Sequence, residues 1–490
     1  MDQTVALPAC VASFAPRDPA DARRLVALVP EKATAVEMRL DHWREAGSVE
    51  ELLSIGPRPV IVTYRTRAQG GDFAGSSEEY RRLVAGAHAA GATVDVEHAS
   101  GLLDDPTQLA DRGRVIVSHH SPFSIPEDWR DRLAAMLACR ARAVKFVCGA
   151  PDLAASLELA AIQTKYRGDS VAAFPMGPAS PPGRVLSALS GAALVYGPVE
   201  TPTASGQIPM RELLETYAVD RPRPIAALYG IVGSDVAGSL SPALHNALFR
   251  SRELPSLYLP LPVADWERSD PTRLAFDPAF RGFSVTQPWK LAAASAGRAS
   301  DEVRETEAAN TLWKSGALWR SGNTDVDAIF DPLADHDTGE GRTAVVLGTG
   351  GAARAAIVAT RRLGYEVLVC GRRDVAADAL AEKFRVDSLA HEDLGQTEAD
   401  LYVNATPLGA RPDDPPAFPR SVLENRPLVF DCVYRRDGSA TSTVAAARAA
   451  SCPTVDGIQM FAAQAVSQAR LFGVEDASLE EVERLLREAR

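Results

Sequence analysis

The regular alternation of short and long segments over residues 1–218 constrains the fold most strongly. Short β-branched apolar segments are separated by longer segments rich in Ala, Leu, Arg and Glu, which is typical of strands and helices alternating around a parallel sheet. Eight strand candidates lie at residues 5–13, 35–40, 59–64, 93–97, 114–118, 143–147, 170–174 and 192–196. Eight such units over this length match a closed (β/α)8 barrel better than an open sheet.

Polar residues lie at or near the ends of the predicted strands. The C-terminal strand ends of such a barrel meet at one mouth, where barrel enzymes place their chemistry. The residues are Glu37, Arg39, Arg65, Glu97, His120, Lys145 and Met176-Gly177. A strand-end lysine taken alone more often reaches solvent or pairs with a carboxylate such as Glu37. Convergence with a histidine and several arginines, Arg184 included, instead favours a nucleophilic lysine in a site for a carboxylated, hydroxylated substrate.

The motifs that carry these residues resemble those of type I 3-dehydroquinate dehydratases. They are Glu37-Met38-Arg39-Leu40-Asp41, Thr63-Tyr64-Arg65-Thr66, Ser118-His119-His120, Lys145, and Met176-Gly177 followed by Arg184. The resemblance covers residues 1–218. It implies that Lys145 forms an imine with the substrate ketone, while His120 removes a proton and returns it to the departing hydroxyl.

The same resemblance implies roles for the surrounding side chains. Arg184 would bind the substrate carboxylate, and Glu37, Arg39 and Arg65 would bind substrate or tune the site. Thr203 and Gln207 would belong to a lid, although the family's Ser-Ala-Pro-Gly-Gln lid reads Thr-Ala-Ser-Gly-Gln in this chain. Where the family often has an acidic residue four positions after the arginine, this chain has Gln69.

A glycine motif in the second half predicts a dinucleotide site. The strand candidate at residues 343–347 runs into Gly348, Gly350, Gly351 and Ala352 and then an alanine-rich segment. Glycines in this context let a pyrophosphate approach the backbone N–H groups of a helix N-terminus, as in a Rossmann domain. The next strand, at residues 366–370, ends in Gly371-Arg372-Arg373. Arginine in place of an acidic residue suits a 2′-phosphate, so NADP is favoured over NAD.

Seven motifs, the glycine motif included, resemble those of shikimate dehydrogenases. They are Gly238-Ser239-Leu240-Ser241-Pro242, Gly282-Phe283-Ser284-Val285-Thr286-Gln287-Pro288-Trp289-Lys290, Ala309-Asn310-Thr311, Gly322-Asn323-Thr324-Asp325, Asn404-Ala405-Thr406-Pro407, the segment from Asp456-Gly457 to Gln464, and the glycine motif. The resemblance implies that Ser239 and Ser241 bind the substrate carboxylate. Ring hydroxyls would be bound by Thr286, Asn310, Asp325 and Gln464. Lys290 with Asp325 would handle the proton that accompanies hydride transfer, and Thr406 would lie at the cofactor.

The two resemblances predict the organisation of the chain. We expect a barrel at residues 1–218, a linker at 219–224, a substrate-binding domain at 225–335 with 456–490, and a Rossmann NADP-binding domain at 336–455. A net charge of -12 without a long basic run argues against nucleic acid as a partner, and no apolar stretch is long enough to span a bilayer. Six scattered cysteines suit a reducing compartment better than disulfides or zinc. We expect a cytoplasmic protein without a metal site.

The sequence therefore predicts a bifunctional shikimate-pathway enzyme. Its small-molecule partners would be 3-dehydroquinate, which it dehydrates, 3-dehydroshikimate, which it reduces with NADPH, and the product shikimate. Two alternatives stay open at this stage. The second half would act on quinate in one of them, and in the other the chain would be a non-catalytic regulatory homologue of the pathway enzymes.

Overall fold

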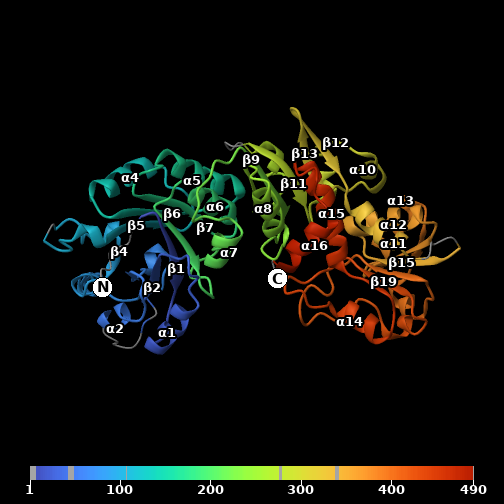
Figure 1. Cartoon of the computed structure of the whole chain (residues 1–490), viewed down its shortest axis with the longest axis horizontal. Helices are drawn as coiled ribbons and strands as arrows, with labels where there is room; N and C mark the ends of the chain where they lie inside the picture. Colours follow the sequence, from blue (N-terminus) through green and yellow to red (C-terminus); the bar gives the residue numbers. More distant parts are fainter. Residues whose placement is uncertain are drawn as a thin grey trace. The chain divides into compact units, whose positions relative to one another are not determined.

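The chain forms two compact units in its computed structural model, each described here by itself (Figure 1). The structure describes residues 7–41, 43, 49–105, 107–274, 279–336 and 341–488. The first unit contains residues 1–226 together with the short segments 259–269 and 274–277, and the second contains the remainder. The predicted division into domains at residues 218, 224, 335 and 455 stays a prediction.

The first unit is built from eight parallel strands. These are β1 (Ala9–Phe14), β2 (Ala35–Arg39), β3 (Val60–Thr63), β4 (Thr93–Glu97), β5 (Val115–Ser121), β6 (Ala143–Gly149), β7 (Val171–Met176) and β8 (Leu194–Pro198). Helices follow the strands along the chain: α1 (Pro19–Ala27), α2 (Val49–Leu53), α3 (Ser77–Ala89), α4 (Trp129–Ala138), α5 (Leu153–Lys165), α6 (Pro181–Leu189) and α7 (Met210–Glu215). Paired strands run in the order β7-β6-β5-β4-β3-β2-β1-β8. A hydrogen bond of 2.9 Å from Ala9 N to Ala193 O and one of 2.8 Å from Ala193 N to Val171 O bring the two edges together.

This nearly closed barrel confirms the predicted fold class, with corrections at some strand ends. Residues 5 and 6 of the first predicted strand lie outside the described residues, and β1 itself begins at Ala9, directly after Pro8. Proline has no N–H to give to a strand ladder, which explains this start. Strand β5 continues to Ser121, three residues beyond its predicted end, so His120 lies within the strand.

The first sheet of the second unit mixes parallel and antiparallel strands, although residues 259–262 at the end of one strand are counted with the first unit. Its strands are β9 (Ala227–Gly233), β10 (Ser256–Pro262), β11 (Phe280–Val285), β12 (Arg298–Ala299), β13 (Thr311–Ser315) and β14 (Leu318–Gly322), in the order β10-β9-β11-β13-β14-β12. Associated helices are α8 (Ser241–Ser251), α9 (Lys290–Ala293), α10 (Asp301–Thr306) and α11 (Asp325–Ala334). Strand β9 begins at Ala227, three residues after Pro224.

The second sheet is parallel throughout. Its strands are β15 (Thr343–Leu347), β16 (Glu366–Cys370), β17 (Asp387–Leu389), β18 (Leu401–Asn404), β19 (Leu428–Asp431) and β20 (Thr454–Val455), in the order β17-β16-β15-β18-β19-β20. Numbered within the sheet this is the order 3-2-1-4-5-6 of a Rossmann fold, whose ligand crevice lies where the order reverses, between β15 and β18. The helices are α12 (Gly351–Arg362), α13 (Asp374–Phe384) and α14 (Ser442–Ala449), followed by α15 (Gly457–Leu471) and α16 (Leu479–Glu488).

Helix α15 links the two lobes of the second unit. Its N-terminus carries a capping box in which the side chains of Asp456 and Gln459 satisfy each other's backbone N–H groups. Met460 packs into the core of the Rossmann lobe, whereas Phe461 packs into the core beside α8. Polar residues on α15 are thereby held in the space between the two sheets. Among the described residues, no helix is both long and apolar enough to cross a membrane.

Replacing each of two glycines in the barrel helices with alanine should change the free energy of unfolding in opposite directions. A Cβ added at Gly183 in α6 would lie 2.3 Å from the carbonyl oxygen of Ser156 in α5, whereas one added at Gly86 in α3 would meet nothing within 4 Å. We expect Gly183→Ala to force the helices apart and lower the free energy of unfolding by about 2 kcal/mol. Gly86→Ala should raise it by about 0.5–1 kcal/mol, because alanine favours a helix interior.

Urea unfolding of the full chain, followed by circular dichroism, measures both changes. Each variant serves as the control for the other, because the substitution is the same and both glycines lie within helices. Equal midpoints for the two variants would contradict the close approach of α5 and α6.

Candidate active sites

The barrel mouth brings together every residue that the sequence predicts for the first site. One cavity between the strand ends is lined by all eight: Glu37, Arg39, Arg65, His120, Lys145, Arg184, Thr203 and Gln207. They come from β2, β5, β6, α6 and the segments after β3 and β8. Parallel strands place these side chains at one end of the barrel although 170 positions separate Glu37 from Gln207 in the sequence.

Lys145 is buried between two carboxylates. Its Nζ lies 3.1 Å from Glu37 Oε1 and 3.1 Å from Asp95 Oδ2. Glu37 is fixed in turn by hydroxyl donors, with Ser13 Oγ at 2.6 Å and Thr63 Oγ1 at 2.9 Å. Burial opposes ionisation of Asp95, but the charges of Arg65 and Lys145 outweigh it and lower the pKa of Asp95 to about 2. The lysine is therefore held in one position by two ionised partners.

His120 lies next to this cluster with a neutral ring. Its backbone N–H donates to Gln69 Oε1 at 2.9 Å, which fixes the end of β5. Burial, followed by the positive charges of Arg65 and Lys145, lowers the pKa of His120 well below its ordinary value. Its Nδ1 has no hydrogen-bond partner among the described residues. A neutral imidazole with an unoccupied nitrogen is suited to accepting a proton.

The three arginines of the mouth differ in their partners. Arg65 lies 2.8 Å from Asp95, and Arg39 makes two hydrogen bonds to Asp41, at 2.9 and 2.7 Å. Arg184 is buried, and in the described part of the chain no carboxylate pairs with it and its Nε lacks a hydrogen-bond partner. Burial lowers the pKa of Arg184 to about 10, and its guanidinium lies 4.9 Å from the ring centroid of Phe174. An anionic ligand would therefore supply the ion-pair partner that Arg184 lacks.

The segment after β8 closes over the cavity. Gln207 Oε1 accepts hydrogen bonds from the backbone N–H groups of Thr203 at 2.7 Å and Ala204 at 3.0 Å. The cavity beneath has a volume of about 50 Å³, and a wider one of about 510 Å³ shares Arg39, Gly70 and Thr203 with it. Because 50 Å³ holds only a few waters, movement of residues 201–207 would be needed to join the two spaces for a larger ligand.

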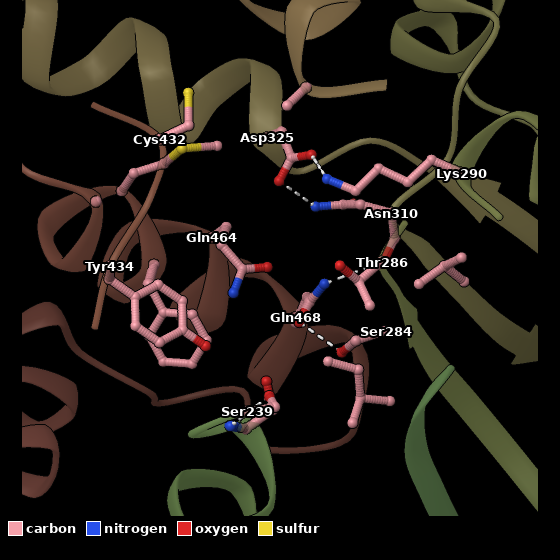
Figure 2. A pocket seen from close by; sticks show the side chains of 17 residues that line it. Ser239, Ser284, Thr286, Lys290, Asn310, Asp325, Cys432, Tyr434, Gln464 and Gln468 are labelled. Carbon is pink, nitrogen blue, oxygen red and sulfur yellow. Dashed lines mark hydrogen bonds and ion pairs between the residues drawn. The ribbon is translucent and has the colours of Figure 1, made fainter. Parts of the chain in front are cut away.

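A second cavity, of about 170 Å³, lies within the second unit (Figure 2). All seven substrate-site residues predicted there line it: Ser239, Ser241, Thr286, Lys290, Asn310, Asp325 and Gln464. Figure 2 shows Gln464 at the centre of this group, with Ser239 on one side and Lys290, Asn310 and Asp325 on the other. These seven residues come from segments that connect or follow strands of the first sheet and from α15. Ala352, Cys432 and Tyr434 of the Rossmann lobe complete the wall, so the cavity exists only when the lobes are packed together.

A lysine and a carboxylate meet in this cavity. Lys290 Nζ lies 2.5 Å from Asp325 Oδ2, and Asn310 Nδ2 donates to Asp325 Oδ1 at 2.8 Å. Asp325 is the first residue of α11, where the helix dipole favours a negative charge. Thr324 N donates to Asn310 Oδ1 at 2.8 Å, which fixes the amide. The arrangement provides an ammonium and a carboxylate that are able to exchange a proton with a substrate oxygen.

The glycines at the β15 edge leave space for a dinucleotide. Gly348 has φ +136°, and a Cβ there would lie 2.7 Å from Ala405 O. A Cβ at Gly350, the N-cap of α12, would meet nothing within 4 Å, so the N-terminus of the helix is open to a phosphate. A Cβ at Gly351 would lie 2.8 Å from Lys290 Cβ. This glycine brings the predicted cofactor loop against the predicted catalytic lysine, with Ala352 lining the same cavity.

The remaining predicted cofactor residues lie at the same end of the sheet. Arg372 and Arg373 follow β16 and are exposed, directly before α13. Thr406 follows β18, and its hydroxyl donates to Asn404 Oδ1 at 2.6 Å. The crevice between β15 and β18 is where Rossmann folds bind nucleotides, so the residues present fit a dinucleotide with an additional phosphate near the arginines.

Sequence reasoning missed several residues that complete the two sites. Asp95 is two positions before Glu97 on β4, and the two-residue period of a strand could have revealed that they share a face. Gln468 is one helical turn after Gln464 on α15, a spacing that also predicts a shared face. Ser284 accepts from Tyr258 Oη at 2.7 Å and donates to Gln468 Oε1 at 2.7 Å. No local pattern signals that chain of hydrogen bonds, because its members are far apart in sequence.

Comparison with known proteins assigns both halves. The family model for type I 3-dehydroquinase matches residues 9–223, and the family model for the shikimate dehydrogenase substrate binding domain matches residues 231–312. A shikimate dehydrogenase (NADP(+)) of Pelobacter propionicus is 34% identical over 257 residues, which are 49% of this chain and 89% of that protein. The chain belongs to the shikimate dehydrogenase family. Its first half carries the type I 3-dehydroquinase match, so the pair of families predicted from sequence is confirmed.

Relatives with both halves are also found. The chloroplastic bifunctional 3-dehydroquinate dehydratase/shikimate dehydrogenase of Arabidopsis thaliana is 29% identical over 475 residues, covering 90% of this chain and 77% of that protein. Among solved structures, the dehydroquinate dehydratase and shikimate dehydrogenase of S. pombe is similar at 22% identity and a TM-score of 0.42, over 97% of this chain and 98% of that one.

A buried histidine beside the second site predicts a dependence of stability on pH. His245 in α8 stacks on Tyr258 at 4.5 Å, and neither ring nitrogen has a partner among the described residues. Burial lowers the pKa of His245 to about 3. Between pH 6.5 and 3 the unfolded chain therefore binds a proton that the folded chain does not, and stability falls as the pH falls. At pH 5 the loss is about 2 kcal/mol.

Unfolding free energies at pH 7 and pH 5 test this for the full chain and for His245→Leu. The variant removes the titrating ring, so its loss between the two pH values should be smaller by about 2 kcal/mol. Taking the difference between the two proteins cancels the other titrating groups. An identical loss in both would show that His245 is not the source.

Proposed function

We propose that this chain catalyses two consecutive reactions, the dehydration of 3-dehydroquinate to 3-dehydroshikimate and the NADPH-dependent reduction of 3-dehydroshikimate to shikimate. The observation that carries the proposal is the presence of two separate cavities, each lined by every catalytic and substrate-binding residue that the sequence predicts for one reaction. A regulatory homologue without catalysis has no need of both the Lys145 cluster and the Lys290 pair. The order of the halves along the chain follows the order of the reactions.

In the dehydratase site Lys145 is the nucleophile. After passing a proton to a neighbouring base, its amine adds to the substrate ketone, and loss of water gives an iminium. His120 takes a proton from the adjacent carbon, and the electron pair of that bond moves toward the nitrogen to give an enamine. The enamine expels the β-hydroxyl, which leaves as water with the proton from His120. Hydrolysis of the remaining imine releases the unsaturated ketone and frees Lys145.

The other groups of the barrel mouth bind and polarise the substrate. Arg184 pairs with the substrate carboxylate, since it is the arginine of the mouth without an acidic partner in the described structure. Glu37 and Asp95 stabilise positive charge on the lysine nitrogen. Arg65 holds Asp95 in place, and Arg39 pairs with Asp41. Thr203 with Gln207 covers the substrate.

In the dehydrogenase site the residues orient a cyclic ketone and supply its proton. Ser239 and Ser241 bind the carboxylate, whereas Thr286, Asn310, Asp325 and Gln464 bind ring hydroxyls. Lys290 donates a proton to the carbonyl oxygen as it becomes a hydroxyl, and Asp325 holds the ammonium in position. NADPH supplies the hydride when bound.

The cofactor would be held by Gly348, Gly350, Gly351, Ala352, Thr406 and the two arginines. Relatives named as NADP(+)-dependent support this choice. Arg372 and Arg373 are exposed at the end of β16, where the 2′-position of the ribose lies in this fold. The cytoplasmic location stays a prediction, because the Arabidopsis relative is described as chloroplastic.

Two lysine variants test the assignment of the two reactions. Lys145→Met should lower dehydration by at least about 1000-fold, since no other lysine lines that cavity in the described part of the chain, and leave reduction of 3-dehydroshikimate unchanged. Lys290→Met should lower reduction by about 100-fold or more and leave dehydration unchanged. Steady-state rates for each substrate measure both, and each variant is the folding control for the other.

Borohydride trapping locates the covalent step. Treating the full chain with sodium borohydride and 3-dehydroquinate should attach the reduced ligand to the peptide that contains Lys145, with a mass gain equal to the bound ketone minus the water of imine formation plus two hydrogens. No peptide of Lys145→Met should gain this mass. A fully active chain that gives no adduct would contradict an imine mechanism. Faster oxidation of quinate than of shikimate by the second half would favour the quinate alternative.

The two arginines after β16 should determine the preference for NADPH over NADH. Replacing both Arg372 and Arg373 with Ala should raise the KM for NADPH about tenfold or more, because charged hydrogen bonds to the 2′-phosphate are lost. The KM for NADH should stay within twofold of the original. Arg385→Ala, at the exposed end of α13, is the matched control. Equal effects on both cofactors would contradict the assignment of these arginines.

A further inference from the structure

Tyr196 on β8 has a buried hydroxyl that the mechanism above leaves unused. The residue is 5% exposed and lines the same cavity as Lys145, His120 and Arg184. Its Oη has no hydrogen-bond partner among the described residues. Buried tyrosine hydroxyls are normally paired, so an unpaired one at the wall of a binding cavity requires an explanation.

The ring of Tyr196 lies against the nucleophile. Lys145 Nζ is 4.1 Å from the ring centroid, a distance at which the negative face of the ring attracts a cation. The nitrogen is thus held on three sides, by Glu37, by Asp95 and by the ring. Because the hydroxyl is carried by the same rigid ring, a molecule joined to Nζ lies within reach of it.

The hydroxyl is able to act only as a neutral hydrogen-bond donor or acceptor. Burial, followed by the nearby charges of Glu37 and Asp95, raises the pKa of Tyr196 well above its usual value. The proton therefore stays on the oxygen at neutral pH. A protonated phenol beside anionic groups is a donor to an oxygen of a bound ligand.

Three buried polar groups of this cavity lack both a hydrogen bond and an ion pair within the described residues. They are Arg184 Nε, His120 Nδ1 and Tyr196 Oη. The other polar groups here, such as Glu37, Arg65 and Gln207, are already engaged. Arg184 is a cation, His120 is a base and Tyr196 is a neutral hydrogen-bond donor. Together they complement a carboxylate, an acidic carbon-bound proton and a hydroxyl or carbonyl-derived oxygen on one ring.

We propose that Tyr196 is a further substrate-binding residue of the dehydratase site, whose hydroxyl donates a hydrogen bond to a substrate oxygen once the substrate is attached to Lys145. The inference rests on the dehydratase activity proposed above. The ring of Tyr196 holds the lysine nitrogen in the free protein, and the hydroxyl becomes paired only when substrate is bound.

Tyr196→Phe in the full chain separates this role from a structural one. The variant keeps the ring against Lys145 and removes a group that has no partner in the described structure, so the unfolding midpoint should stay the same or rise. The kcat/KM for dehydration should fall about tenfold, because the hydrogen bond to the substrate is lost. A hydroxyl needed only for packing would instead lower activity and midpoint together.

Two controls accompany this variant. Tyr166→Phe removes a hydroxyl from a tyrosine that packs on the outer core of the barrel, and it should change neither property. Reduction of 3-dehydroshikimate by Tyr196→Phe should equal that of the original chain, since the second unit is untouched.

The outcomes distinguish the inference from the function on which it rests. Dehydration by Tyr196→Phe within twofold of the original, or a loss that accompanies a lowered midpoint, would overturn the inference and leave the proposed function intact. An original chain that does not dehydrate 3-dehydroquinate would overturn both.

Discussion

The barrel mouth depends on burying the charge of Lys145 between Glu37 and Asp95. A charge taken out of water is costly unless it is paired and hydrogen-bonded, and here each carboxylate is also bound by a hydroxyl, from Ser13 or Ser118. Arg65 shares Asp95 with the lysine, so positive and negative charges alternate across the strand ends. This network fixes Lys145, the proposed nucleophile, before substrate arrives and leaves Arg184 as the buried arginine for an incoming anion.

The second unit has a different structural requirement, because it has to hold two ligands, the substrate and the dinucleotide, side by side. Gly351 brings the first turn of α12 against the side chain of Lys290, and any larger residue would push these apart. Helix α15 holds Gln464 and Gln468 in the same space because its neighbouring residues Met460 and Phe461 pack into different cores. The close contact at Gly351 and the packing of α15 against both cores therefore place the side chains of the substrate site at the open end of the Rossmann sheet.

Much of this arrangement follows from local sequence patterns. The strand and helix alternation predicts the barrel, and the glycines after β15 with the order of segments predict the Rossmann sheet. Strand ends place Glu37 and Lys145 at one mouth, as the structure has them. What the sequence does not reveal are the partners brought in from distant elements. The placement of Asp95 and of the Tyr196 ring against Lys145 depends on barrel closure, which no local pattern encodes. The placement of Ser284 between Tyr258 and Gln468 depends in the same way on the packing of its lobe.

The central claim is that one chain carries out both reactions in succession. Supplying purified full-length chain with 3-dehydroquinate and NADPH, and measuring shikimate by chromatography alongside NADPH absorbance, tests it directly. We predict one shikimate formed for each NADPH oxidised, with 3-dehydroshikimate detectable as the intermediate. Persistence of 3-dehydroquinate, or accumulation of 3-dehydroshikimate while NADPH stays unoxidised, would contradict the account.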